Sequence, residues 1–495
     1  MFQERTAKYE LIARGRELEY IFHPRSIALV GISSDPKNFT AGHGFLKGLL
    51  EFGYCGQIYP INPKAAQILG LKAYPSVRDA PETVDHAISL VPAPLTPQLI
   101  EDCGAKGVKV VHLYTAGFAE TGEKEGERLQ AELLARARRL GIRIIGPNCM
   151  GIHYPENGIT FDMRLPQGAK ESGRISFLSQ SGGNAVDLVH AGPFRGLYFN
   201  KVVSYGNAID LNESDFLENF AADPNTEIIA AYIEGIKDGR RFWQALKEAA
   251  KFKPVIVLKG GRTAAGAGAV GSHSASMAGN EDVWKTLLKQ AGAIRAYTMD
   301  ELADLLVVFS HLRPLAGRNA GVIGVGGGNS VEAADLCEAA GLFVPALPID
   351  IRKQLREFTP EAGTGIRNPI DTTNLFSPKE LSRTIELVAG CAGIDFLMIQ
   401  HQLGISFLRD EGRALFEAAL DAMIETAVGI AKPVTITLRH RGGAQGMSLL
   451  AETQEKCVKA GLAVIPSIER AAIAISRFVS YHEHRNGVQP RGAGI

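Results

Sequence analysis

The residues best suited to chemistry lie between 259 and 280, in the stretch KGGRTAAGAGAVGSHSASMAGN. Nearly all of them are Gly, Ala, Ser or Thr, and one imidazole, His273, lies in the middle. Small residues let backbone amides and hydroxyls approach a ligand closely. A histidine there can be a proton shuttle, a metal ligand or a nucleophile. The alternative interpretation is a flexible, Gly-rich surface loop with an incidental histidine.

A second candidate is the turn Ser179-Gln-Ser-Gly-Gly183, between an expected strand over 174–178 and an expected helix from 184. Free amides at a helix N-terminus and the positive end of its dipole attract anions. The same residues could instead form a tight turn with serine N-caps. Glu234 follows an expected strand over 226–233 and reaches the same edge of the sheet, either to orient a histidine or as a solvated cap.

Together these residues indicate a histidine that takes up a phosphoryl group, carried by a mobile loop of small residues. No second ligand accompanies His273 at metal spacing, and GxSxG, the signature of a nucleophilic serine, is absent. We therefore expect a phosphate cradle (Ser179, Ser181, Gly182 and Gly183), an orienting carboxylate (Glu234), and no metal site.

The elements that precede this constellation alternate as strands and helices. Apolar runs near 26–31, 56–60, 85–91, 108–113 and 143–148 are separated by helical segments at βαβ spacing, which predicts an open, mostly parallel sheet. Ligands of such sheets bind at the strand carboxyl ends, where polar and glycine residues gather: Gly31, Ser33, Ser34, Lys64, Thr115 and Asn148. An amphipathic helix over 1–20 is expected to pack on this domain.

The turn after the first strand reads GISSDP, which lacks the GxGxxG pattern of dinucleotide-binding folds. A dehydrogenase-like protein that binds NAD is therefore disfavoured. A nucleotide-like ligand with phosphates remains plausible, with Lys64 as an anion partner; the alternative is that Lys64 is a solvated loop lysine.

An internal repeat follows. ISFLSQSGGNAVDL is echoed by GVIGVGGGNSVEAADL, KPVIVLKGGRTAAG by KPVTITLRHRGGAQ, and AGAIRAYTMDELADLL by AGLAVIPSIERAAIAI. Residues 172–310 and 319–478 are therefore predicted to be two copies of one α/β unit. The second copy has a short loop where the first has the His273 stretch. A loop present in one copy only indicates a task rather than a requirement of the fold.

The composition fits this picture. At 495 residues, two to four domains are expected, and equal totals of 53 basic and 53 acidic residues favour neither nucleic acid nor a membrane surface. The six scattered cysteines suggest reduced thiols and a cytoplasmic protein. No apolar run reaches the length of a membrane span, and the polar N-terminus is no signal peptide.

The sequence resembles the α-type subunit of the NDP-forming acyl-CoA synthetases, the superfamily of succinyl-CoA synthetase and ADP-forming acetyl-CoA synthetase. The resemblance covers about residues 20–480 and rests on HPRSIALVGIS, IYPINPK, GPNCMGI, ISFLSQSGG, YIEGIKDG and GSHSASMAG. It implies a Rossmann-like CoA-binding domain over 1–150 and a flavodoxin-like, doubly wound ligase domain with the phosphohistidine loop over 151–315. A second flavodoxin-like domain is implied over 316–495.

The resemblance also implies roles for individual residues. His273 becomes phosphohistidine, Ser181, Gly182 and Gly183 hold its phosphate, and Glu234 hydrogen-bonds the imidazole. Coenzyme A lies across the first domain, along Gly31, Ser33, Ser34, Lys64, Thr115, Ala116 and Asn148. Acid, CoA and ATP interconvert with acyl-CoA, ADP and phosphate through an acyl phosphate.

Three departures from the family pattern matter. Nothing in the sequence resembles the ATP-grasp half that binds ATP/ADP and Mg²⁺, so a separate β-type subunit and a hetero-oligomer are implied. Val186 replaces the acyl-site tyrosine of succinyl-CoA synthetase, which argues against succinate and places the acyl pocket near Asn184 and Val186. The loop reads SHSA rather than SHTG. The competing hypothesis is a non-catalytic, CoA-binding regulatory module.

Overall fold

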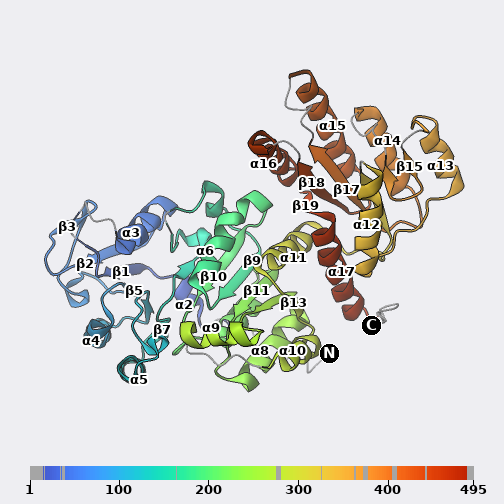
Figure 1. The fold of residues 1–495 in the computed structure, drawn as a ribbon. Coiled ribbons are helices and arrows are strands. Elements are labelled where there is room, and N and C mark those ends of the chain that lie inside the picture. Colours follow the sequence, from blue (N-terminus) through green and yellow to red (C-terminus); the bar gives the residue numbers. More distant parts are fainter. Residues whose placement is uncertain are drawn as a thin grey trace. The chain divides into compact units, whose positions relative to one another are not determined.

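The computed structural model describes residues 15, 17–33, 35, 40–162, 164–274, 280–324, 326–361, 364–371, 377–403, 410–440 and 443–487. The chain forms two compact units (Figure 1), the first of residues 1–193 and 198–299, the second of residues 194–197 and 300–495. Of the helix expected over 1–20, most lies outside the described residues; a short helix, α2 (Glu19–Phe22), leads into the first strand.

The first unit begins with a five-stranded sheet in which every pairing is parallel. Its order is β2 (Gln57–Ile61), β1 (Ser26–Val30), β5 (His86–Ser89), β6 (Val110–Leu113) and β7 (Arg143–Ile145). Helices α3 (Ala41–Phe52), α4 (Thr96–Lys106) and α5 (Lys124–Arg139) connect the strands, while β3 (Gln67–Ile68) and β4 (Leu71–Lys72) form a small hairpin. The expected parallel α/β sheet is confirmed.

A second sheet completes the first unit. Its order is β13 (Ile294–Ala296), β12 (Val255–Lys259), β11 (Ile228–Ile233), β9 (Ile175–Ser179), β10 (Phe199–Ser204) and β8 (Gly151–His153), and β8 is antiparallel to its neighbour. Its helices include α6 (Gly182–Ala191), α7 (Glu213–Ala222), α8 (Gly239–Phe252), α9 (Ala264–Ser274) and α10 (Glu281–Ala291). Strands β9, β10 and β12 are buried at every residue, as expected of a parallel sheet covered on both faces.

The second unit holds a third sheet with the same plan. Its order is β19 (Ala463–Ile465), β18 (Val434–His440), β17 (Phe396–Leu403), β14 (Ala320–Gly324), β16 (Ile370–Asp371) and β15 (Gly365–Ile366), with β15 antiparallel. Its helices are α11 (Met299–His311), α12 (Gly327–Ala339), α13 (Ile349–Arg356), α14 (Pro378–Ala389), α15 (Asp410–Gly429), α16 (Gly443–Lys459) and α17 (Ile468–Arg485). The predicted repeat is therefore confirmed at the level of strand order.

The two antiparallel edge strands have different origins. Strand β8 precedes the first strand of its repeat, whereas β15 follows the first strand of the other repeat. Helix α11, which the sequence assigns to the middle domain, belongs to the second unit, where Asp304 pairs with Arg195 and Arg470. The domain bounds 1–150, 151–315 and 316–495 remain predictions.

The predicted loop over 259–280 is wrong for its central part, because residues 264–274 form helix α9. Alanine is the strongest helix former and occurs four times between 264 and 269. The Thr263 hydroxyl accepts a hydrogen bond from the Gly266 amide at 3.1 Å, and buried Val270 packs toward Gly261. The last part of the predicted loop, 275–279, lies outside the described residues. Within those residues, no helix is long and apolar enough to cross a membrane.

Candidate active site

A cavity of about 320 Å³ opens where turns of the first and second sheets meet. Two residues predicted to bind CoA, Ala116 and Asn148, line it together with Ser181, Gly182 and Gly183 of the predicted phosphate cradle. The remaining lining residues are Tyr114, Cys149, Met150, Gln180, Gly206 and Asn207. Two groups of residues that sequence reasoning treated separately thus share one cavity.

The N-terminus of α6 forms one wall of this cavity. Ser181 is the N-cap, and its hydroxyl accepts a hydrogen bond from the Asn184 amide at 3.3 Å. The buried Ser179 hydroxyl donates to the Ser181 carbonyl at 2.6 Å, so Ser179 shapes the turn rather than lining the cavity. A Cβ on Gly182 would lie 2.9 Å from Met150 Cγ, so a larger residue here would displace the Met150 side chain that lines the cavity. Both proposed roles of the serines, cap and cradle, are compatible with this geometry.

The opposite wall is built from backbone held in tight turns. Asn148 has φ of 58° and donates its amide to the Thr115 carbonyl at 3.0 Å. The Thr115 hydroxyl donates to the Val91 carbonyl at 2.6 Å, which ties the ends of β5 and β6 together. Gly206 has φ of 53°, and a Cβ there would lie 2.2 Å from the Pro147 carbonyl oxygen. Close contact between these turns fixes the width of the cavity.

Asn207 is a site residue that the sequence analysis missed. Its amide donates to Glu120 Oε2 at 2.5 Å and to Gln130 Oε1 at 3.3 Å. Glu120 Oε1 in turn accepts the amides of Gly117 and Phe118. These bonds connect the turn after β10 to the turn after β6. Asn207 follows a strand end in the sequence, a position that could have marked it as a candidate.

Glu234 lies directly beside the cradle. Its side chain is 4% exposed. The amides of Glu234 and Gly235 donate to Gln180 Oε1 at 2.8 and 3.1 Å, so Gln180 of the SQSGG turn holds the end of β11 in place. The hydroxyl of Tyr232 donates to Glu234 Oε1 at 3.2 Å. The predicted proximity of Glu234 to the anion cradle is therefore seen in the structure.

Two ionisable groups are shifted by this environment. Burial is the main reason that the pKa of Tyr232 rises to about 12, with a further contribution from the Glu234 carboxylate. Burial also lowers the pKa of Lys259, against the pull of Glu234 and Glu281. The Lys259 ammonium donates to the Glu234 carbonyl at 2.8 Å and to the Gly260 carbonyl. Tyr232 therefore stays protonated at neutral pH and acts as a hydrogen-bond donor.

The backbone of His273 lies in the last turn of α9, and its side chain is outside the described residues. Helix α9 contacts the short 3₁₀ helix Ala119–Thr121, whose Glu120 holds Asn207 of the cavity. The helix that carries His273 thus packs against one wall of the site. A meeting of His273 with Glu234 and the cradle remains a prediction.

Other predicted residues lie at the same sheet edge without lining the cavity. Gly31 and Ser33 follow β1, and exposed Lys64 follows β2. The Asn62 amide group joins these ends by donating to the Ile32 carbonyl at 2.7 Å. Ser34 lies outside the described residues. Asn184 and Val186, predicted to form the acyl pocket, lie on the first turns of α6.

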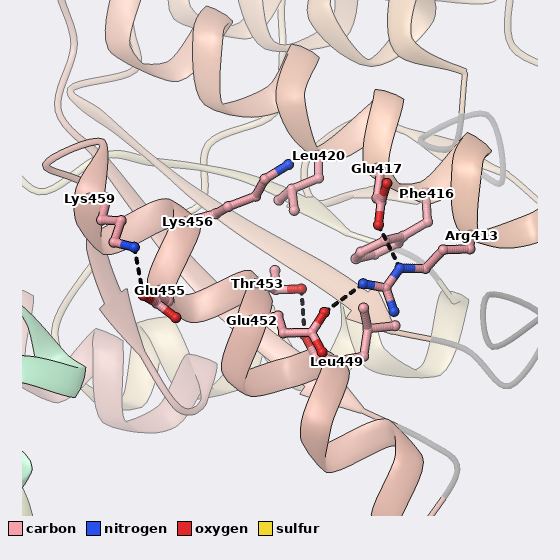
Figure 2. A pocket seen from close by; sticks show the side chains of 10 residues that line it. All are labelled: Arg413, Phe416, Glu417, Leu420, Leu449, Glu452, Thr453, Glu455, Lys456 and Lys459. Carbon is pink, nitrogen blue, oxygen red and sulfur yellow. Dashed lines mark hydrogen bonds and ion pairs between the residues drawn. The ribbon is translucent and has the colours of Figure 1, made fainter.

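A second cavity, of about 200 Å³, lies between α15 and α16 of the second unit (Figure 2). Each charged side chain that lines it has an ion-pair partner: Arg413 pairs with Glu417 and Glu452, Lys456 with Asp421, and Lys459 with Glu455. The charged side chains of this groove are therefore held in ion pairs at the protein surface. None of the predicted site residues lines the groove. Within the described residues, no group of three or more His, Cys, Asp or Glu side chains is placed to hold a metal ion.

The strands of the two sheets in the first unit lie in segments that match two known families of domains. Residues 25–155 match the family model of the CoA binding domain, and residues 172–309 match that of the succinyl-CoA ligase like flavodoxin domain. The α subunit of acetate–CoA ligase (ADP-forming) I from Pyrococcus furiosus is 39% identical over 379 residues, which cover 74% of this chain and 79% of that subunit. The chain belongs to the family of ADP-forming acyl-CoA synthetases.

Other members of this family show how the chain relates to longer proteins. The acetate–CoA ligase (ADP-forming) I of Archaeoglobus fulgidus is 38% identical over 77% of this chain but only 54% of that protein. The chain thus spans about half the length of such relatives and about four fifths of the α subunit. A solved structure of dinucleotide-forming acetyl-coenzyme A synthetase 1 from Ca. Korarchaeum cryptofilum, in complex with phosphate and ADP, is 32% identical. It superposes with a TM-score of 0.79, over 95% of this chain and 98% of that one.

Proposed function

We propose that this chain is the α-type part of an ADP-forming acyl-CoA synthetase and carries the phosphoryl group on His273. The observation that supports this most directly is the shared cavity, in which Asn148 and Ala116 of the CoA-binding sheet face the open N-terminus of α6. A thioester held by the first sheet and an anion held by α6 would meet there. This geometry suits attack of phosphate on a thioester, which needs both reactants in one site.

In the direction of ATP formation, a phosphate oxygen attacks the thioester carbonyl and the CoA thiolate leaves, giving an acyl phosphate. The His273 imidazole then attacks the phosphorus, the carboxylate leaves, and phosphohistidine forms. Finally ADP attacks the phosphohistidine to give ATP and free histidine. The amides at the α6 N-terminus stabilise the phosphoryl oxygens, and Glu234 accepts a hydrogen bond from the imidazole so that the reactive nitrogen stays unprotonated.

The ADP step needs a nucleotide site with Mg²⁺, and the sequence offers no candidate for it. We place that site on an ATP-grasp β-type partner, in a hetero-oligomer in the cytoplasm. Relatives named as α subunits support a separate partner, whereas longer relatives have additional length in one chain. We further assign CoA to Gly31, Ser33, Ser34, Lys64, Thr115, Ala116 and Asn148, and the acyl group to the region of Asn184 and Val186.

The carboxylic acid that this protein activates can be identified by experiment. Relatives are named for acetate, for 4-hydroxybutyrate and, at 32% identity over 93% of this chain, for trans-ferulate. A panel of acetyl-CoA, 4-hydroxybutyryl-CoA and feruloyl-CoA, each with radiolabelled inorganic phosphate, would rank the substrates by the rate of protein labelling.

The same assay tests the proposed function. Wild-type chain incubated with acyl-CoA and labelled phosphate should acquire acid-labile label, and a β-type subunit with ADP should discharge it to ATP. His273→Ala should acquire none. Wild-type protein that binds CoA but never acquires label would instead indicate a non-catalytic, CoA-binding regulatory module.

A further inference from the structure

Tyr232 occupies a central position beside the α6 turn. It is the second-last residue of β11, and it pairs in register with Ser179 of β9 on one side and with Leu258 of β12 on the other. Ser179 begins the SQSGG turn, and Leu258 precedes the segment that leads to α9. Tyr232 therefore lies between the predicted anion cradle and the helix that carries His273.

The hydroxyl of Tyr232 lies between two separate segments. It donates to Glu234 Oε1 at 3.2 Å. It also lies close to Gly260, where a Cβ would be only 2.6 Å from the hydroxyl oxygen. One phenol thus lies between the carboxylate and the start of the His273 segment.

The third sheet has no counterpart of the Tyr232 and Glu234 pair. Gly324 occupies the position of Ser179, and its neighbour on β17 is Gln400, because Ile323 pairs with Ile399. Gln400 and Gln402 therefore take the positions of Tyr232 and Glu234. The tyrosine and the carboxylate are both present in the copy that carries the His273 segment and both absent from the other, which links the tyrosine to the carboxylate's task.

We propose that Tyr232 is a positioning residue that fixes the Glu234 carboxylate against the α6 turn, so that Glu234 is oriented for His273 before phosphate arrives. A glutamate side chain has several rotatable bonds, and a hydrogen bond from a rigid phenol removes much of that freedom. Gln180 of the SQSGG turn accepts the amides of Glu234 and Gly235, so the backbone that carries this carboxylate is held to the cradle turn. This inference rests on the proposed function.

The experiment compares Tyr232→Phe with Tyr154→Phe. Tyr154 also donates to a glutamate two residues later, Glu156, at 2.8 Å, and neither residue lines the cavity. Tyr232→Phe should lower the rate constant of labelling by acyl-CoA and inorganic phosphate about tenfold, the loss of one hydrogen bond to a charged group. The dissociation constant for CoA should not change. Tyr154→Phe should label at the wild-type rate.

A double-mutant cycle separates positioning from a general structural effect. If Tyr232 acts through Glu234, the double variant Tyr232→Phe, Glu234→Gln should label no more slowly than Glu234→Gln alone. Gly260→Ala would place a methyl group 2.6 Å from the Tyr232 hydroxyl and 3.3 Å from Glu234 Cγ, so it disturbs the same pair from the other side and should also slow labelling. The inference would be overturned if Tyr232→Phe and Gly260→Ala were both labelled within twofold of the wild-type rate. It would also be overturned if the effects of Tyr232→Phe and Glu234→Gln were additive in the cycle. An unlabelled wild type would overturn the proposed function instead.

Discussion

The second and third sheets share one strand order but differ at the N-terminus of the helix after their first strand. Helix α6 is capped by Ser181, and the position beside the turn on the neighbouring strand is Ser204, which pairs with Ser179. At α12 the N-cap is Gly326, and the equivalent neighbour is Asp371, which pairs with Gly324. The buried Asp371 carboxylate accepts the Gly326 amide at 2.5 Å. The third sheet thus supplies its own anion, whereas the second has an uncharged serine at the equivalent position, which is compatible with the phosphate site proposed at α6.

The copies also differ in the segments that follow β12 and β18. In the third sheet, α16 begins at Gly443, soon after β18 ends at His440, and runs unbroken to Lys459. In the second sheet the same interval holds two helices, α9 and α10, and the residues between them. The carboxylate at Glu234 becomes an amide at Gln402. The comparison teaches that one fold is used twice, and that the groups we propose for phosphoryl chemistry are present in the first copy and replaced in the second.

The largest expected effect comes from giving the second sheet the carboxylate of the third. In Ser204→Asp, a carboxylate beside the α6 turn would satisfy its amides and repel phosphate. Labelling should fall by about 100-fold or more. Ser204→Ala is the matched control, since it removes the same hydroxyl without adding charge and should label within about fivefold of wild type. Equal labelling of Ser204→Asp and Ser204→Ala, with both folded by thermal unfolding, would contradict the comparison.

A smaller effect is expected when the second sheet receives the amide of the third. Glu234→Gln keeps the size of the side chain but removes the charge that stabilises the imidazole during phosphorylation. The rate constant of labelling should fall about 30-fold, as expected for loss of a charge-assisted hydrogen bond. Binding of CoA, measured by calorimetry, should stay at its wild-type value. Loss of CoA binding in this variant would mean that Glu234 belongs to a different site.

The smallest effect is expected at the self-capped terminus. Asp371→Ala leaves the Gly326 amide without its acceptor, which should lower the free energy of unfolding of the second unit by about 1 kcal/mol. Labelling should be unchanged, because the proposed reaction uses α6 and not α12. Differential scanning calorimetry and the labelling assay measure the two quantities on one sample. A labelling defect in this folded variant would show that the third sheet contributes to phosphoryl transfer.

Periodicity and turn residues were enough to predict the parallel sheets, the internal repeat and the neighbourhood of Glu234 and the SQSGG turn. These features depend on local patterns that recur every few residues. The helix at 264–274 was missed because its glycines suggested a loop, while its alanines and the Thr263 cap favour a helix. Asn207 and Tyr232 were missed because their roles depend on contacts across strands, which no spacing along the chain reveals. The ligand-binding roles of Gly31, Ser33 and Lys64 remain predictions.

The central claim is that the phosphoryl group resides in the first copy, on His273. The most direct measurement is mass spectrometry of the chain after reaction with acyl-CoA and inorganic phosphate, with digestion under alkaline conditions that preserve phosphohistidine. The account predicts a single phosphorylated peptide that contains His273, and no phosphate on the peptide that contains His440 at the matching strand end of the third sheet. Phosphate on a peptide of the third sheet, or on any peptide of His273→Ala, would contradict it.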